Sequence, residues 1–268
     1  MSFVYKTVDV GIEASQIFWS HDSVDDHIGL CAYETTLPIF LGQLPKDGVI
    51  LDAGCGLARW VFYLREKGYG VLGTDYAHAA LARALRTRPA PLFCSDTLQM
   101  PIADGALAGI ISLGVIEHAP EGPAKALREL HRVLRPDGIA LVAVPYNNPW
   151  RRGLINHLRR FRDWQKQRNG FKLDFAEYRF SARELSGFLR DAGFDVLSVH
   201  ADDFNPPLGK GLWVDSSSFF GYRVGMWDLA PGRKRWELNR RGRILQSCAN
   251  LISPWLIAAG VLAVARRK

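Results

Sequence analysis

Carboxylates and glycines stand where three successive apolar runs end. The first group, Asp52-Ala53-Gly54-Cys55-Gly56, separates an apolar run from a segment of helical periodicity. Glycines at such a turn let the backbone bend and approach a ligand, and the helix start presents free N–H groups. Asp75 and Asp96 end the next two runs. A carboxylate at the second position can accept both ribose hydroxyls, and one at the third can accept from an adenine amino group. Together they predict a nucleoside site, although either Asp alone is as typical of a turn or helix cap.

The elements that must position these side chains have the pattern of a parallel sheet covered by helices. Helical periodicity begins at Leu57 and stops at Gly68. A later helix begins at Ser181, which forms a capping box with Glu184, and ends at Gly193. Short runs that are almost wholly apolar separate such segments, as expected for strands buried on both faces. The predicted strands are residues 49–52, 71–74, 92–94, 109–113, 139–144, 194–199 and 260–265.

Length and composition favour one elaborated globular domain. The chain has 268 residues, of which 48% are hydrophobic, enough to bury one full core. The four cysteines lack the paired spacing of a zinc site or a disulfide framework, so we expect reduced cysteines and no metal. The first ten residues lack the pattern of a secretory or transit segment, which predicts a cytoplasmic location.

Residues 244–265 form the most apolar stretch near the C-terminus, flanked by arginine on both sides. Its length is close to that of a transmembrane helix. Gln246, Asn250 and Pro254 interrupt its first half, and polar groups are costly in hydrocarbon without partners. We therefore expect a helix followed by a final strand of the sheet.

The net charge of +7 is concentrated in two segments. Residues 150–172 hold eight Lys or Arg against Asp163 alone, and residues 231–243 hold six against Glu237 alone. Outside them, acidic side chains outnumber basic ones. The basicity therefore belongs to insertions and not to the core.

The motifs at the strand ends resemble those of class I S-adenosylmethionine-dependent methyltransferases, specifically the small-molecule, methyltransferase type 11-like subgroup. The resemblance runs from about residue 49 to residue 200 and rests on five motifs in order. They are LDAGCG, GTDYA, CSDTLQMP, SLGVIEH, and LHRVLRPDG followed by IALVAVP. The resemblance implies an α/β, Rossmann-like, doubly wound fold with a seven-stranded, mostly parallel sheet, and S-adenosylmethionine as cofactor.

The same resemblance assigns the cofactor-binding residues. It implies that the methionine end, the ribose and the adenine are each held by a different strand end, with one further residue lining the cofactor after the fourth strand. These residues are, in that order, Asp52, Gly54 and Gly56; Asp75 with Tyr76 beside it; Asp96, Thr97 and Leu98; and Leu113. Three positions depart from the family pattern: Ala58 replaces a common third glycine, Ala108-Gly109 replaces Phe-Asp, and Asp137 replaces the first glycine of a Pro-Gly-Gly turn.

A candidate catalytic pair, Glu117 and His118, follows the fourth predicted strand. Methyl transfer from a sulfonium is an in-line displacement, and it needs a general base only when the acceptor is a hydroxyl or a similar group. His118 is the candidate base and Glu117 its candidate orienting partner. A Glu-His pair also recurs in this family as a scaffold feature that closes the cofactor pocket, and the sequence leaves that alternative open.

Additions around the sheet are expected to recognise the methyl acceptor. We predict an N-terminal helical cover in residues 1–47 and a methyltransferase domain in residues 48–268, with insertions at about 146–180 and 201–243. Aromatic residues of the cover and of the second insertion either line a pocket or pack in a core. They include Phe18, Trp19, Tyr33, Phe204, Trp213, Phe219, Phe220, Tyr222 and Trp227, with His21 and Glu34 also in the cover.

The expected acceptor is a small molecule, a glycan or a lipid that is methylated on oxygen. A nucleic acid is not expected, because the Asn/Asp-Pro-Pro-aromatic turn of base-amino methyltransferases is missing after the fourth strand. Alternatives are a nucleic-acid methyltransferase, suggested by the basic insertions, and a non-catalytic protein that binds S-adenosylmethionine. A nicotinamide-dependent oxidoreductase would also use a glycine turn, but it favours the third glycine that Ala58 replaces.

The insertion at residues 151–168 has the pattern of a basic amphipathic helix. Leu154, Ile155, Leu158, Phe161 and Trp164 recur at helical spacing among Arg151, Arg152, Arg159, Arg160, Arg162, Lys166 and Arg168. The favoured interpretation is a lid or packing helix whose apolar stripe buries against the sheet edge. The alternative is peripheral contact with an anionic membrane, which would place a cytoplasmic protein at a lipid surface.

Overall fold

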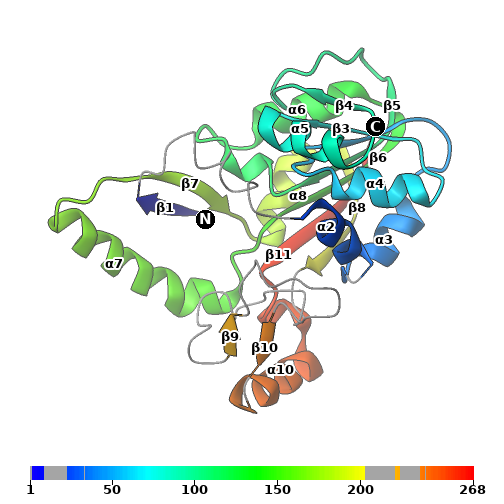
Figure 1. Ribbon diagram of the computed structural model, residues 1–268. Coiled ribbons are helices and arrows are strands. Elements are labelled where there is room, and N and C mark those ends of the chain that lie inside the picture. The colour runs from blue at the N-terminus through cyan, green and yellow to red at the C-terminus, as the bar shows by residue number, and fades with distance from the viewer. Residues whose placement is uncertain (1, 9–22, 33, 203–220, 224–235, 239) are drawn as a thin grey trace.

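A seven-stranded sheet forms the centre of the structure (Figure 1). The computed structural model describes residues 2–8, 23–32, 34–202, 221–223, 236–238 and 240–268. The strand order is β4-β3-β2-β5-β6-β11-β8; β2 to β6 are parallel, and β11 is antiparallel to both of its neighbours. The strands are β2 Ile50–Ala53, β3 Val71–Asp75, β4 Leu92–Cys94, β5 Leu107–Leu113, β6 Leu134–Pro145, β8 Phe194–Asp202 and β11 Gly260–Arg267. The predicted fold class is confirmed.

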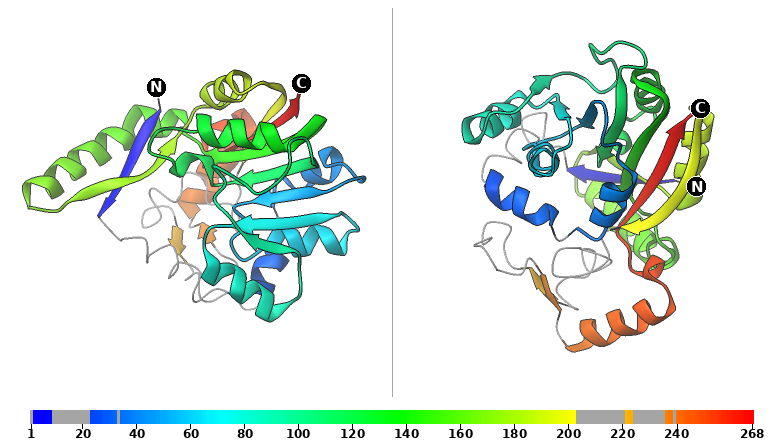
Figure 2. Two further views of the ribbon diagram at one scale, coloured as in Figure 1. Left: turned by 90° about the horizontal axis from the view of Figure 1, so that it is seen from above. Right: turned by 90° about the vertical axis from the view of Figure 1, so that its right-hand side faces the viewer.

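Helices cover both faces of the sheet, which explains why the central strands are apolar throughout (Figure 2). One apolar core joins the sheet to α2 Val24–Cys31, α3 Leu37–Gln43, α4 Arg59–Glu66 and α5 His78–Thr87. The other joins it to α6 Ala124–Val133 and α8 Ala182–Asp191. The carboxyl ends of β2, β3, β4 and β5 therefore share one edge of a sheet that is fixed from both sides.

Local signals in the sequence set the element ends as predicted. Ser181 and Glu184 form the reciprocal capping box of α8, and the chain leaves that helix through Gly193 at φ 98°. Ala58 and Asp137, two of the positions where the family has glycine, both have φ of 59°. The backbone keeps the left-handed conformation there even though a side chain is present.

The C-terminal segment folds as a helix and a strand, as expected. Helix α10 spans Arg240–Ile252, and β11 then inserts between β6 and β8. Within the described part of the chain, none of the helices has the length and apolar character needed to cross a bilayer.

The prediction of an N-terminal helical cover is correct for α2 and α3 but wrong for residues 3–8. These residues form β1 (Phe3–Val8), which pairs antiparallel with β7 (Leu173–Arg179). The partner strand lies far away in the sequence, so local periodicity gave no sign of it. Most of the aromatic residues expected to line the acceptor mouth lie outside the described residues: Phe18, Trp19, Tyr33, Phe204, Trp213, Phe219, Phe220 and Trp227, as does His21. Of the 201–243 insertion, the described part includes β9 Gly221–Arg223 paired with β10 Trp236–Leu238.

The first insertion folds with β1 into a projecting unit, here called the arm (residues 2–8 and 146–180). It contains a π-helical turn at Arg151–Ile155, then α7 Asn156–Arg168 and β7. Two views show it extending away from the sheet (Figures 1 and 2). At its base, Phe180 N–H donates to the Pro145 carbonyl at 3.0 Å, and Asn147 N–H donates to the Phe180 carbonyl at 2.8 Å.

Buried polar side chains anchor that base. Asn148 donates from Nδ2 to the Ala258 carbonyl at 2.9 Å, and Arg151 donates from Nη1 to the carbonyls of Tyr146 (2.6 Å) and Ala259 (3.1 Å). The prediction that Arg151 belongs to the cationic surface of the helix is therefore wrong. Its guanidinium is buried and satisfies backbone carbonyls of the sheet end.

The predicted apolar stripe of α7 does not bury against the sheet edge. Leu158, Phe161 and Trp164 are 48%, 55% and 49% exposed. The helix instead packs on β1 through its cations, because the Arg159 guanidinium carbon lies 4.8 Å from the centre of the Tyr5 ring and that of Arg160 lies 5.8 Å from the Phe3 ring. The expected burial is therefore wrong for Leu158, Phe161 and Trp164, although Ile155, just before α7, is buried.

The left-handed backbone at Asp137 yields a stability prediction. Asp137 is exposed, so its replacement changes little packing. Asp137→Gly should raise the free energy of unfolding by about 1 kcal/mol, because glycine removes the cost of the left-handed conformation. Chemical denaturation measures it. Asp137→Ala is the control, since it removes the carboxylate and keeps the Cβ. Equal stabilisation by both variants would contradict the backbone explanation.

Candidate functional site

Asp52 ends β2 with a buried carboxylate at the edge where the parallel strands finish. Its Oδ2 is buried and accepts no hydrogen bond from the residues that the structure describes. Burial raises the pKa of Asp52 to about 7; the Arg59 guanidinium opposes the rise and the Asp75 carboxylate adds to it. A buried carboxylate with a free oxygen has the capacity to accept from a cationic or N–H group of a ligand.

The glycines after Asp52 form a tight turn in which a side chain at Gly54 would clash with its neighbour. Gly54 has φ 81°, and a Cβ placed on it would lie 2.3 Å from a methyl carbon of Val115. The Gly54 and Cys55 N–H groups both donate to the Thr74 carbonyl, at 2.8 and 2.9 Å. The backbone of this turn is therefore pressed against β3 on one side and the segment after β5 on the other.

Asp75 joins the ends of β2 and β3. Its Oδ2 accepts from Gly56 N–H at 2.7 Å, and its Oδ1 accepts from Ala77 N–H at 2.8 Å. A carboxylate has about four acceptor positions, so both oxygens can accept further hydrogen bonds. The predicted Tyr76 follows with its side chain 65% exposed.

The loop after β4 carries Asp96, Thr97 and Leu98 to the same edge. Asp96 Oδ1 accepts from Leu98 N–H at 2.8 Å, which closes a local turn, and the Asp96 side chain is exposed. Asp96 therefore caps this turn with one carboxylate oxygen.

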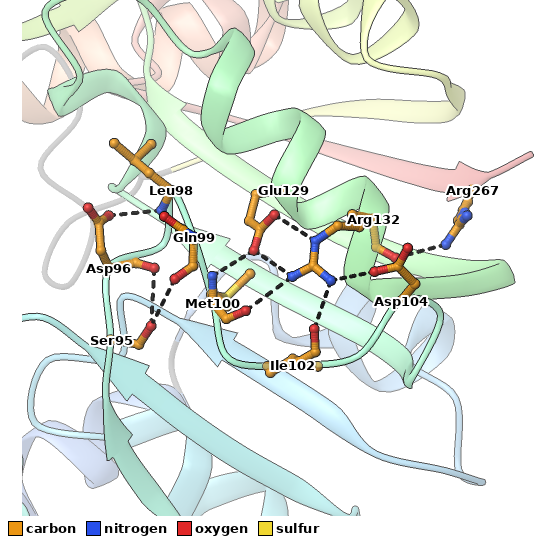
Figure 3. A network of polar contacts seen from close by, with 10 residues as sticks. All are labelled: Ser95, Asp96, Leu98, Gln99, Met100, Ile102, Asp104, Glu129, Arg132 and Arg267. Atoms are coloured by element: carbon orange, nitrogen blue, oxygen red, sulfur yellow. Dashed lines mark hydrogen bonds and ion pairs between the residues drawn. The ribbon is translucent and has the colours of Figure 1, made fainter.

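A polar network holds this loop against α6 (Figure 3). Arg132 pairs with Glu129 through two contacts, of 2.8 and 2.7 Å, and also donates to the carbonyls of Ile102 (2.8 Å) and Met100 (3.1 Å). Glu129 in turn accepts from Met100 N–H at 2.6 Å, and Arg132 bonds Asp104 at 2.5 Å. A planar guanidinium with five donors suits this task, so the loop bearing Asp96 is fixed at its far end.

Leu113 ends β5, and Glu117 follows in a short 3₁₀ turn, Ile116–His118. Glu117 is buried, and its Oε2 has no hydrogen-bond partner within the described part of the chain. Burial raises its pKa to about 8, its own backbone N–H opposes the rise, and Glu177 of β7 adds to it. A second buried carboxyl group with a raised pKa therefore lies beside the turn.

His118 is held by the arm rather than by Glu117. Its Nδ1 lies 2.9 Å from the Ala176 carbonyl oxygen of β7, whereas its Nε2 lies 3.9 Å from Glu117 Oε1. A carbonyl can only accept, so Nδ1 carries the proton in this contact and Nε2 of the neutral ring is an acceptor. The imidazole side chain is 55% exposed.

Sequence reasoning missed three contributors to the site. Arg59, at the start of α4, forms an ion pair with Glu34 at 2.7 Å and acts electrostatically on Asp52. Ala176 and Tyr178 of β7 contact the segment after β5, with Tyr178 Oη donating to the Pro120 carbonyl at 2.7 Å. No local signal could reveal these contacts, because they join segments 58 residues apart.

The edge as a whole can bind a nucleoside that carries a cationic group. Asp52 has an unpartnered oxygen for an ammonium, and Asp75 keeps acceptor capacity for two hydroxyls. These features fit S-adenosylmethionine. Among the described residues, no cluster of three His, Cys, Asp or Glu side chains is arranged to hold a metal ion.

Comparison with known proteins identifies the family of this region. Residues 51–142 match the model of a methyltransferase domain family. A tRNA (carboxymethyluridine(34)-5-O)-methyltransferase of Xenopus tropicalis is 36% identical over 107 residues, covering 39% of this chain and 17% of that protein. A probable S-adenosylmethionine-dependent methyltransferase of Mycolicibacterium smegmatis is 27% identical over 148 residues, covering 55% of this chain and 52% of that protein.

A solved structure, that of an S-adenosylmethionine-dependent methyltransferase from Archaeoglobus fulgidus, has the same fold. It superposes with a TM-score of 0.57 and covers 97% of this chain and 100% of its own, at 15% sequence identity. The extra elements of this chain are thus arranged around a shared sheet.

The relatives also correct one expectation. Several of them are named as tRNA methyltransferases, among them proteins of Xenopus tropicalis, Bos taurus and Mus musculus. The prediction that a nucleic acid is not a partner is therefore wrong. It depended on a motif of enzymes that methylate base amino groups, which does not describe transfer to other atoms of RNA.

The fold, the order of acidic strand ends and the match to the family model agree with one another. Residues 51–142 of the chain therefore form a methyltransferase domain, and the chain has the fold of S-adenosylmethionine-dependent methyltransferases, whose cofactor is S-adenosylmethionine.

Proposed function

We propose that this methyltransferase transfers the methyl group of S-adenosylmethionine to a hydroxyl oxygen of an RNA. The observation that carries the proposal is the position of the arm. Its strand β7 contacts the turn that bears His118, and its helix α7 is basic and aromatic. The arm therefore meets the acceptor side of the site with a surface suited to nucleic acid.

The names of the relatives support an RNA acceptor. The Xenopus relative is named for transfer to an oxygen of a modified tRNA uridine, and its matched region is 36% identical. The chain spans 17% of the length of that protein, so the resemblance carries the methyltransferase region and not the whole activity. The small-molecule, glycan or lipid acceptor expected from the sequence is the contrary outcome of the test below.

The residues of the sheet edge would hold the cofactor. S-adenosylmethionine supplies an activated methyl group on sulfonium when it is bound. Asp52 would accept from the ammonium of the methionine end, next to Gly54 and Gly56, and Asp75 would accept from the ribose hydroxyls. Asp96, Thr97 and Leu98 would bind the adenine, with Tyr76 and Leu113 lining the site.

His118 would serve as the general base. Its Nδ1–H is fixed on the Ala176 carbonyl, which leaves Nε2 to accept the proton of an acceptor hydroxyl. The oxygen gains the methyl group as its proton passes to Nε2. Glu117, buried and neutral, would keep negative charge away from Nε2 and shape the pocket beneath the turn.

Asp75→Asn should weaken S-adenosylmethionine binding about 10- to 100-fold, because a neutral amide loses charge-assisted hydrogen bonds to the ribose. Isothermal titration calorimetry measures the affinity, and thermal melting without ligand reports any loosening of the contact with Gly56. The control is Asp191→Asn, an exposed residue at the end of α8. Unchanged affinity in a folded Asp75→Asn variant would remove Asp75 from the cofactor site.

His118→Ala should lower turnover at saturating cofactor about 100-fold and leave cofactor affinity nearly unchanged. His118→Asn separates base from scaffold, because the amide can still donate to the Ala176 carbonyl but cannot take a proton. Both variants should be equally slow. Recovery of turnover in His118→Asn would show that the residue only positions the turn.

The acceptor is tested by incubating the full chain with isotopically labelled S-adenosylmethionine and a cell extract divided into RNA and small-molecule fractions. We expect label in the RNA fraction, alkali-stable and released as a methylated nucleoside on nuclease digestion. The His118→Ala variant is the matched control for label that the chain does not transfer. Label confined to the small-molecule fraction would overturn the RNA proposal and favour the original expectation.

A further inference from the structure

A cleft of 320 Å³ opens on the arm between β1 and α7. Its walls combine the rings of Phe3 and Trp164, the cations of Lys6 and Arg160, and the hydrogen-bonding side chain of Gln167. None of these residues belongs to the cofactor site at the sheet edge. The cleft is therefore a separate feature with its own chemistry.

Three planar groups line up along α7 next to this cleft. The Phe161 and Trp164 rings stack with centroids 5.8 Å apart and an interplanar angle of 26°. The Arg168 guanidinium carbon lies 5.0 Å from the centre of the Trp164 ring. Positions 161, 164 and 168 fall on one side of a helix, so the three groups form a continuous planar row. Both rings are about half exposed.

Cations outnumber acidic residues around this row. Arg152, Arg160, Arg162, Lys166 and Arg168 are exposed along the turn and helix, and Lys6 of β1 is exposed opposite them. Asp163 is the one acidic residue of α7. Stacked rings among exposed cations match the two parts of a single-stranded nucleic acid, its bases and its phosphates.

The polar lining of the cleft favours a nucleotide over a lipid. Asp163 and Gln167 present a carboxylate and an amide into the same cleft as Trp164. The edge of a nucleobase can satisfy these groups by hydrogen bonding, whereas an acyl chain would leave them desolvated.

We propose that the arm binds single-stranded RNA, with unpaired bases stacked on the row of Phe161, Trp164 and Arg168 and phosphates held by Lys6 and Arg160. The inference rests on the proposed RNA acceptor and adds the place where that RNA docks. Within the arm, strand β7 pairs with β1 and also contacts the His118 turn. RNA bound to the arm would therefore lie close to the reactive edge.

Fluorescence anisotropy of a labelled 12-nucleotide single-stranded RNA of mixed sequence tests the proposal with the full chain. Trp164→Ala should weaken binding about 10-fold and Trp164→Phe much less, because stacking needs an aromatic face. The Lys6→Glu/Arg160→Glu variant should weaken binding more than 10-fold and reduce the slope of log affinity against log salt by about 1.4, as expected when two phosphate contacts are lost. The control is Arg86→Glu/Lys125→Glu, which makes the same charge change on exposed residues of α5 and α6 and should bind RNA normally.

Three results would overturn the proposal. The first is an equal loss of RNA affinity in the control variant. The second is unchanged RNA binding in both Trp164→Ala and Lys6→Glu/Arg160→Glu, with normal melting temperatures. The third is that these two variants lose binding to anionic phospholipid vesicles without losing RNA binding. The experiment can reject RNA binding by the arm separately from the proposed RNA acceptor. Methyl transfer to RNA with unaltered kinetics in the arm variants would reject the arm and keep the acceptor, whereas RNA binding to the arm with methyl transfer confined to small molecules would reject the acceptor and keep the arm.

Discussion

The need to satisfy a buried carboxylate organises the reactive edge of this protein. Asp75 receives N–H groups from Gly56 and Ala77, and these two bonds tie the turn after β2 to the end of β3. A buried carboxylate without such donors would cost several kcal/mol. The glycine turn can therefore take one position against β3, and the unpartnered oxygen of Asp52 is held beside it. This acceptor remains available to a ligand.

The need to satisfy buried polar side chains also fixes the base of the arm. Asn148 and Arg151 are buried where β6 ends, and their donors go to the carbonyls of Tyr146, Ala258 and Ala259. These bonds join the start of the insertion to the segment that leads into β11. The chain must then leave the sheet in one direction, and β7 returns past the turn that bears His118. The arm is thus positioned by polar contacts at its base, while its far side stays exposed to solvent.

The division between shared and added parts explains why the acceptor is harder to derive than the cofactor. A structure only 15% identical to this chain has the same fold, and a shared fold does not by itself fix the acceptor. The arm adds cations and aromatic rings beside that edge. The chemistry of the arm differs from that of the rest of the chain, which is weakly acidic once the basic insertions are set aside.

The sequence by itself determined the strand segments, the acidic residues at their ends and the capped helix at Ser181, because each depends on residues close together in the chain. It also marked Ala58 and Asp137 as departures from glycine, and both have left-handed backbone. Only the tertiary structure decided the pairing of β1 with β7, the burial of Arg151 and the tethering of His118 by Ala176. Helical periodicity predicted that α7 is amphipathic, but it could not say which face would find a partner. In the folded protein the rings of Phe3 and Tyr5 pack against Arg160 and Arg159, so the aromatic residues of α7 stay exposed to solvent.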